Sequence, residues 1–314
     1  MNIYFEYTSE YEQSNTDSIK TIDNNNNKKS ILKRITRSCF NIITYQILGE
    51  LILTLILFVM LIWTSVAGTD INIQPVEFQE RDPALSAPLY DSTVSFMGLV
   101  LITIVGPIIL FIIGETIKCW NIGLKQSVSK LAYLALAYTQ CISLTGTVTN
   151  IIKLVVRRPR PNFFMLCDYM DIRTNVSFYL ANTIPGAFGR YSNCFAESSD
   201  IIQAALSFPS GHSSFSFCSM LFIALYIRRW LQLEEGRYLT IFSAIAASPL
   251  ILSTWVAITR VRNRWHNYDD ISVGAVIGIL CALITWYNYV LSGRDNPPPK
   301  KNNLERNNNQ ELSF

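Results

Sequence analysis

Six long apolar stretches constrain the fold of this chain more than any other feature of its sequence. Each is close to the roughly 20 residues that a helix needs to cross the hydrocarbon core of a bilayer. The stretches cover residues 46–67, 93–114, 131–152, 212–230, 238–258 and 271–292. We therefore expect an all-α, polytopic membrane protein with six transmembrane helices.

Three of the stretches carry features that bear on helix shape and packing. The second and fifth contain Pro107 and Pro249, which predict kinks. The fourth has a serine-rich first turn and ends in two arginines, so a re-entrant helix is an alternative to a full span there. Gly274 and Gly278 form a small-xxx-small pair in the sixth stretch, which is typical of close helix packing.

The two ends of the chain differ in composition from the apolar region. Residues 1–44 are polar and include four consecutive asparagines, and residues 293–314 are rich in proline and asparagine. Both ends are expected to be disordered tails, because such segments cannot bury enough apolar surface to fold. The membrane domain is therefore expected over residues 45–292.

The charges of the loops predict the orientation. With the N-terminus in the cytosol, the inner segments hold most of the 26 lysines and arginines, as the positive-inside rule requires. Both tails are then cytosolic. A basic cluster in the third and fifth loops is the exception, because this orientation places it outside. The net charge is only +3, and no basic run interleaved with aromatics is present, so a nucleic-acid partner is not expected.

Three polar motifs lie at the ends of apolar stretches. The first runs from Lys153 to Pro161 at the end of the third stretch, and the second, Pro-Ser-Gly-His, ends at His212 in the fourth. The third runs from Arg260 to Asp270 between the fifth and sixth stretches. Because the third-to-fourth and fifth-to-sixth connections lie on the same face of the membrane, all three motifs can converge in one site.

The residue types in these motifs suit the transfer of a phosphoryl group. The transition state spreads negative charge over three oxygens, which calls for fixed cations and aimed N–H donors. Lys153, Arg160 and Arg260 supply the cations. Ser210 is a good N-cap residue, so the amides that follow it would face the anion from a helix N-terminus. Gly211 lets the backbone approach closely.

The chain has only two histidines, and both fall in the motifs. A neutral imidazole can attack phosphorus when a carboxylate holds its second nitrogen. His266 and Asp270 have this relation, because a spacing of four residues at a helix start puts them on one face. Asp269 is the alternative carboxylate. His212 is then the acid that protonates the departing alkoxide.

The three motifs resemble the signature of the type-2 phosphatidate phosphatase (PAP2) family, also called lipid phosphate phosphatases, which shares its site with vanadium haloperoxidases. The family pattern is Lys, six residues and Arg-Pro; then Pro-Ser-Gly-His; then Ser-Arg, five residues, His, three residues and Asp. The resemblance covers about residues 45–292, and residues 77–86 also resemble the first external loop of fungal members. The matching positions are Lys153, Arg160, Pro161, Pro209, Ser210, Gly211, His212, Arg260, His266 and Asp270.

The resemblance implies both a fold and a reaction. The fold is a six-helix, haloperoxidase-like core with its site on the lumenal or extracellular face of a Golgi, vacuolar or plasma membrane. The reaction is hydrolysis of phosphatidate, lysophosphatidate or diacylglycerol pyrophosphate through a phosphohistidine on His266, with His212 as leaving-group acid. No metal or other cofactor is implied, and no Cys, His and carboxylate cluster has metal-ligand spacing. Pro161 and Pro209 have structural roles in the motifs.

Other functions remain open at this point. Sphingoid-base phosphates and isoprenoid diphosphates are alternative substrates. An inactive lipid-binding or scaffold relative is an alternative class, although such relatives usually lose motif residues and none is lost here. A transporter or channel is disfavoured, because the charges lie at the membrane surface with hydrolase spacing. The oligomeric state does not follow from the sequence.

Four residues depart from the family pattern or its usual variants. Thr259 replaces the serine before the arginine but keeps a hydroxyl. Arg157 stands where animal relatives usually have glycine, Pro159 where they have leucine, and Asn162 where relatives often have His or Asp. These changes bear on loop conformation, substrate entry and headgroup preference. Three further arginines that the pattern does not require are expected to face headgroups or solvent: Arg158, Arg262 and Arg264.

The loop between the third and fourth stretches carries two covalent possibilities. Asn175 begins an Asn-Val-Ser glycosylation sequon in a loop that the orientation places outside. Cys167 and Cys194 lie in the same loop, where an oxidising compartment permits a disulfide worth roughly 3 kcal/mol.

Overall fold

The computed structural model describes residues 47–67, 76–231 and 239–291. The tails expected at residues 1–44 and 293–314 lie outside the described residues. The chain divides into two compact units, residues 1–53 and 54–314. The second unit contains nearly all of the described residues and is the one considered below.

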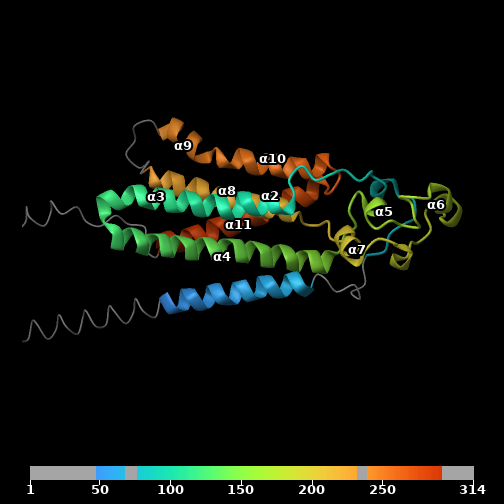
Figure 1. Ribbon diagram of the computed structural model, residues 1–314, viewed down its shortest axis with the longest axis horizontal. Helices are drawn as coiled ribbons and strands as arrows, with labels where there is room; N and C mark the ends of the chain where they lie inside the picture. Colours follow the sequence, from blue (N-terminus) through green and yellow to red (C-terminus); the bar gives the residue numbers. More distant parts are fainter. Residues whose placement is uncertain (1–46, 68–75, 232–238, 292–314) are drawn as a thin grey trace, which may run out of the picture. The chain divides into compact units, whose positions relative to one another are not determined.

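The described part of the chain is built from helices. Its only β-pairing consists of two isolated bridges, so the all-α class expected from the sequence is confirmed. In the second unit, long helices run side by side and short helices gather beyond one end (Figure 1). The elements in chain order are the 3-10 turn η1 (Pro83–Leu85), α2 (Phe96–Val100), the π-helical η2 (Leu101–Val105), α3 (Gly106–Ile122), α4 (Leu124–Val156), α5 (Phe163–Leu166), α6 (Val176–Asn182), the 3-10 turn η3 (Tyr191–Asn193), α7 (Ser198–Ala204), α8 (Gly211–Trp230), α9 (Leu239–Ala247), α10 (Pro249–Arg262) and α11 (Tyr268–Leu291).

Five helical segments of the described residues are long and apolar enough to cross a membrane, and each coincides with one of the six predicted stretches. The chain is therefore a polytopic membrane protein. The fourth stretch coincides with α8, which is helical over 20 residues but does not belong to these five. The five segments are Ile47–Ala67, Phe96–Cys119, Ser127–Val156, Thr240–Arg262 and Tyr268–Leu291.

Helix α8 is less apolar than the others because its polar side chains are satisfied inside the protein. It packs against α4, α10 and α11. Hydrogen bonds from serine and threonine hydroxyls join α8 to all three of these neighbours, and such bonds hold helices together in a membrane. The bonds join Thr149 of α4 to Ser214 (2.9 Å), Ser253 of α10 to the Ser216 carbonyl (3.0 Å), and Ser213 to the Ile271 carbonyl of α11 (2.6 Å).

Two glycines of α11 allow its backbone to touch that of α8. A Cβ atom at Gly274 would lie 2.6 Å from the carbonyl oxygen of Ser210, and one at Gly278 would overlap the carbonyl of Ser214. Only glycine fits at these positions, so the close packing predicted from the small-xxx-small pair is confirmed. The contact fixes the start of α8 against the start of α11.

The two prolines lie where their spans change from one helical segment to the next. Pro107 lies in the first turn of α3, directly after the π-helical η2. Helix α9 ends at Ala247, and α10 begins at Pro249. Proline lacks the N–H that would continue the helical ladder, and its ring crowds the preceding turn.

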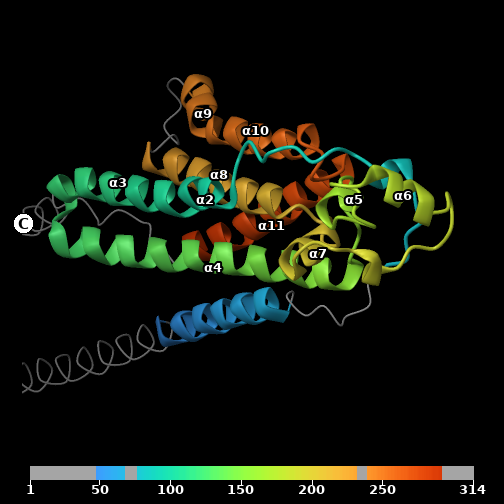
Figure 2. The same ribbon diagram turned by 45° about the vertical axis from the view of Figure 1, so that its right-hand side comes forward.

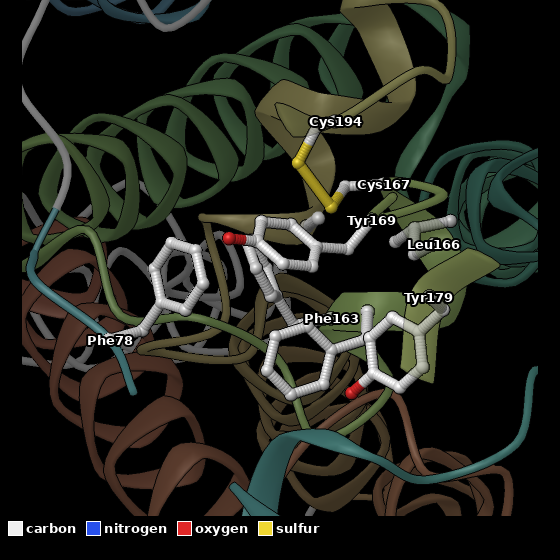
Figure 3. Close-up of a cluster of buried hydrophobic side chains, with 9 residues drawn as sticks. Phe78, Phe163, Leu166, Cys167, Tyr169, Tyr179 and Cys194 are labelled. Carbon is white, nitrogen blue, oxygen red and sulfur yellow. A yellow bond between two sulfur atoms is a disulfide. The ribbon is translucent and has the colours of Figure 1, made fainter. Parts of the chain in front are cut away.

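The residues between α4 and α8 form a small core of their own at the end of the bundle (Figure 2). Aromatic rings fill it, and a disulfide joins Cys167 to Cys194 beside Tyr169 (Figure 3). Glu80, from the loop before α2, reaches into this core, where its carboxylate accepts hydrogen bonds from the Tyr169 hydroxyl (2.6 Å) and the Ile184 amide (2.8 Å). The core therefore combines residues from the loop before α2 with residues from the connection between α4 and α8.

Replacing Cys167 or Cys194 with serine should lower stability. The disulfide spans a sequence separation of 27 residues, and opening such a loop costs about 3 to 4 kcal/mol. The double variant should be no less stable than either single variant, because each single change already opens the bond. Thermal unfolding in detergent measures this, with Cys119→Ser, a free cysteine, as the control. Single variants that keep the wild-type midpoint would contradict the prediction.

Candidate active site

The three motifs meet beside the extramembrane core, where α4 ends, α8 begins and α10 gives way to α11 (Figure 2). Backbone hydrogen bonds join them directly. The Ser207 amide donates to the Arg158 carbonyl (2.9 Å), which links the first motif to the residues before the second. The Ser210 amide donates to the Asp270 carbonyl (2.9 Å), which links the second motif to the third.

The carboxylate of Asp270 is fully buried and is shared by groups from the first and third motifs and by Ser207, which lies just before the second. One oxygen accepts hydrogen bonds from the Ser207 hydroxyl (2.5 Å) and the Asn267 amide (2.8 Å), and lies 3.5 Å from Nδ1 of His266. The other oxygen lies 3.3 Å from Nη1 of Arg158. A buried carboxylate with this many donors is stabilised in its charged form.

His266 is held as a neutral imidazole. Its side chain is 4% exposed, and burial lowers its pKa below the ordinary value, with Arg160 and Lys153 acting in the same direction and the hydrogen bond to Asp270 opposing them. Because Nδ1 faces the carboxylate, that nitrogen carries the proton and Nε2 keeps a free lone pair. The ring is thus prepared to attack an electrophile through Nε2.

Lys153 and Arg160 of the first motif lie near His266, and Arg260 of the third motif lies beside His212. Lys153 donates from Nζ to the Leu206 carbonyl (2.7 Å), and the guanidinium of Arg160 lies 5.0 Å from the centre of the Trp265 ring. Burial, together with the nearby Arg260, lowers the pKa of Arg160 to about 10, so it stays charged at neutral pH.

Several donors of these cations are buried without a partner. Among the described residues, Nε of Arg160 and both Nε and Nη2 of Arg260 make no hydrogen bond. Leaving a buried donor unsatisfied costs about 1–3 kcal/mol, and more for a charged group. An anion with several oxygens would satisfy all three donors at once.

The start of α8 has the predicted cap. Ser210 is the N-cap residue, and its hydroxyl accepts from the Ser213 amide (3.5 Å). A Cβ atom at Gly211 would lie 4.0 Å from Cε of Lys153, so the first turn of α8 adjoins the lysine of the first motif. The first amides of a helix have no intrahelical partner, and their dipoles favour an anion.

His212 is oriented by the loop before α2. Its Nε2 lies 3.1 Å from the carbonyl oxygen of Val94 and 3.5 Å from Nη1 of Arg260. A ring nitrogen that faces a carbonyl must carry the proton, so the carbonyl decides the tautomer. Arg260 in turn donates from Nη1 to the Ser92 hydroxyl (2.8 Å).

Sequence reasoning missed Ser207, Ser92 and the Val94 carbonyl. Ser207 lies two residues before Pro209, and this closeness to a motif was its only signal. Ser92 and Val94 carry no signal, because they reach the site from a loop more than 100 residues away and Val94 acts through its backbone.

The expected role of Arg158 was wrong. It was expected to face headgroups or solvent, but it forms ion pairs with Asp269 and Asp270. Asp269 is therefore occupied by the arginine, while Asp270 faces His266. Arg262 and Arg264 are exposed and, with Tyr268, line a separate cavity of about 240 Å³.

Two departures from the family pattern have a structural counterpart. Arg157 is the C-cap of α4 in a left-handed conformation, with φ of 43°, which glycine adopts freely and other residues at a cost of roughly 1–2 kcal/mol. Thr259 bonds to the Val256 carbonyl of its own helix (2.6 Å), which any hydroxyl could do. Asn162 is fully buried, and its amide has no partner among the described residues.

Comparison with known proteins identifies the family of this chain. Residues 132–294, more than half of the chain, match the PAP2 superfamily, and the chain belongs to that superfamily.

Named relatives come from plants and animals. The chain is 29% identical to lipid phosphate phosphatase 2 of Arabidopsis thaliana over 68% of its own length and 66% of the relative's. It is 28% identical to human phospholipid phosphatase 2, over 65% and 69% of the two chains. The chain spans between 57% and 66% of the length of the three Arabidopsis relatives that it matches.

The neutral state of His266 makes stability depend on pH. The unfolded chain binds a proton below a pKa of about 6.5, whereas the native imidazole does not, so stability falls as the pH drops below that value, by up to about 1.4 kcal/mol per pH unit. Between about pH 7 and pH 5 the thermal midpoint of the wild type should fall more steeply than that of His266→Gln, whose side chain does not titrate. Equal slopes would contradict a neutral, buried imidazole.

Proposed function

We propose that this protein is an integral membrane lipid phosphate phosphatase. Its substrates are phosphatidate, lysophosphatidate and diacylglycerol pyrophosphate, and its products are the dephosphorylated lipid and inorganic phosphate. The observation that carries the proposal is the buried His266–Asp270 pair beside arginine donors that lack partners. The names of the relatives, lipid phosphate phosphatase and phospholipid phosphatase, support it.

The first step forms a covalent intermediate. Nε2 of His266 attacks phosphorus, so a P–N bond forms while the P–O bond to the lipid breaks. Asp270 stabilises the positive charge that develops on the ring through Nδ1. Lys153, Arg160 and Arg260 stabilise the negative charge on the phosphoryl oxygens in the transition state. Their buried donors, which have no partner in the free protein, are available for these oxygens.

His212 handles the proton. His212 acts as the acid in its doubly protonated form, and the departing lipid alkoxide takes one ring proton as the P–O bond breaks, which leaves a neutral imidazole. The ring then accepts a proton from water, which attacks the phosphohistidine, breaks the P–N bond and releases inorganic phosphate. These steps use histidine as nucleophile and arginine and lysine as electrophilic groups, so the proposal requires no metal.

The location of the site fits a lipid that stays in the bilayer. The motifs lie at helix ends, where a phosphate at headgroup level can reach His266 while the acyl chains remain among lipids. We place this end on the lumenal or extracellular side, with the tails cytosolic. The Cys167–Cys194 disulfide supports that side, and so does the exposed Asn175, which could carry a glycan.

Phosphate release from phosphatidate in detergent should vanish in His266→Ala, by a factor of at least about 1,000, because the nucleophile is gone. The same activity in the wild type should survive EDTA. Cys119→Ser, at the far end of α3 from the motifs, should retain it. Normal turnover by the histidine variant, or loss of wild-type activity in EDTA, would sink the proposed mechanism.

The substrate class can be tested in one detergent system. Phosphatidate, lysophosphatidate and diacylglycerol pyrophosphate should be hydrolysed faster than a sphingoid-base phosphate or farnesyl diphosphate, because the intact Pro-Ser-Gly-His motif and final Asp270 match the glycerolipid members of the family. Faster turnover of the other two would favour the alternative substrates. A folded protein inert on all five would favour an inactive lipid-binding relative.

A further inference from the structure

We infer that residues 87–94, the bracing segment, are a fourth component of the site, in which Ser92 and the Val94 carbonyl position Arg260 and His212 for the reaction. The segment precedes α2 and belongs to none of the three motifs. The expected change in kcat/KM rests on the proposed function. The expected change in phosphate binding does not depend on it.

Hydrogen bonds along the bracing segment join it to the first and third motifs. The Ala87 amide donates to the Pro161 carbonyl of the first motif (2.9 Å). From the third motif, Nε1 of Trp265 donates to the Tyr90 carbonyl (2.9 Å), and Nδ2 of Asn263 donates to the Asp91 carbonyl (2.7 Å). The contact of Val94 with His212 joins the segment to the second motif as well.

Asn263 fixes the part of the segment that enters the site. It is the C-cap residue of α10 and is 6% exposed. Besides its bond to Asp91, its Nδ2 donates to the Thr93 hydroxyl (2.8 Å). Ser92 lies between these two anchored residues, so its hydroxyl has little freedom to move away from the arginine.

Ser92 sets the direction of the Arg260 guanidinium. This side chain is 2% exposed, and its Nη1 donates to Ser92 Oγ at 2.8 Å. The guanidinium is a rigid planar group, so fixing one nitrogen orients the other two. Those two, Nε and Nη2, are among the buried donors that have no hydrogen-bond partner in the described part of the chain. Ser92 thus leaves the donors of one edge available for phosphate.

The Val94 carbonyl connects the arginine to the acid. It accepts a hydrogen bond from the Ser92 hydroxyl (2.7 Å) and lies 3.1 Å from Nε2 of His212. The Val94 side chain packs with Leu99 and Val256, which holds the carbonyl in place. Because this carbonyl holds the Nε2 proton, the proton that the doubly protonated His212 ring delivers to the leaving group comes from Nδ1, and the ring is left in its neutral Nε2–H form. One continuous chain of hydrogen bonds therefore orients a phosphate-binding group and the proton donor.

Ser92→Ala should lower kcat/KM for phosphatidate by about tenfold to a hundredfold, the loss typical when the partner of a catalytic group is removed. Inorganic phosphate should also inhibit the variant more weakly and raise its thermal midpoint less than that of the wild type, because a bound ligand stabilises the native state in proportion to its affinity. Ser92→Thr keeps the hydroxyl and should restore both properties. Ser86→Ala is the matched control, because Ser86 is an exposed serine of the same loop whose hydroxyl bonds only to the Asp82 carbonyl among the described contacts.

Three outcomes separate the inference from the proposed function. An active wild type with unchanged kcat/KM and phosphate binding in Ser92→Ala overturns the inference alone. A loss of kcat with unchanged phosphate binding, not rescued by threonine, shows general loosening of the loop and also overturns it. A wild type inert on lipids, yet stabilised by phosphate more than Ser92→Ala is, overturns the proposed function and supports the positioning role.

Discussion

The buried carboxylate of Asp270 is the constraint on which the other features of this structure depend. An ionised carboxylate inside a protein costs several kcal/mol unless donors surround it. Here those donors come from segments far apart in sequence, Arg158, Ser207 and His266 among them. The glycines of α11 let α8 come close enough for the Ser210 amide to reach the Asp270 carbonyl. Folding of the helix bundle and assembly of the site are therefore the same event.

The fold was predictable where a single segment carries enough information. Long apolar stretches identified the membrane helices, and Pro107, Pro249 and the Gly274–Gly278 pair indicated where helices break or touch. Whether α8 is a full span or a re-entrant helix was ambiguous from the sequence. Several of its serines have hydrogen-bond partners on other helices, and the hydropathy of a segment contains no information about such partners. The sequence did not decide whether Cys167 and Cys194 form a disulfide, because that depends on how the aromatic core folds.

The site was predictable where spacing reflects chemistry. The four-residue interval from His266 to Asp270 and the proline-serine-glycine turn before His212 follow from local geometry. The role of Arg158 was wrong, because its partner Asp269 lies 111 residues away and offers no local sign. Ser92 and Val94 could not be found from the sequence, since a backbone carbonyl looks the same at every position.

The dependence of α8 on its neighbours has a consequence for how the chain is made. Helix α8 leaves the ribosome before α10 and α11, yet the Ser213 hydroxyl and the Ser216 carbonyl have hydrogen-bond partners on those later helices. When α8 enters the translocon alone, the polar groups that later bond to α10 and α11 have no protein partner and favour water over the bilayer. Stable insertion of α8 is thus completed only when α11 arrives, so a defect in the last helix would show itself as mistargeting or degradation of the whole chain during biogenesis.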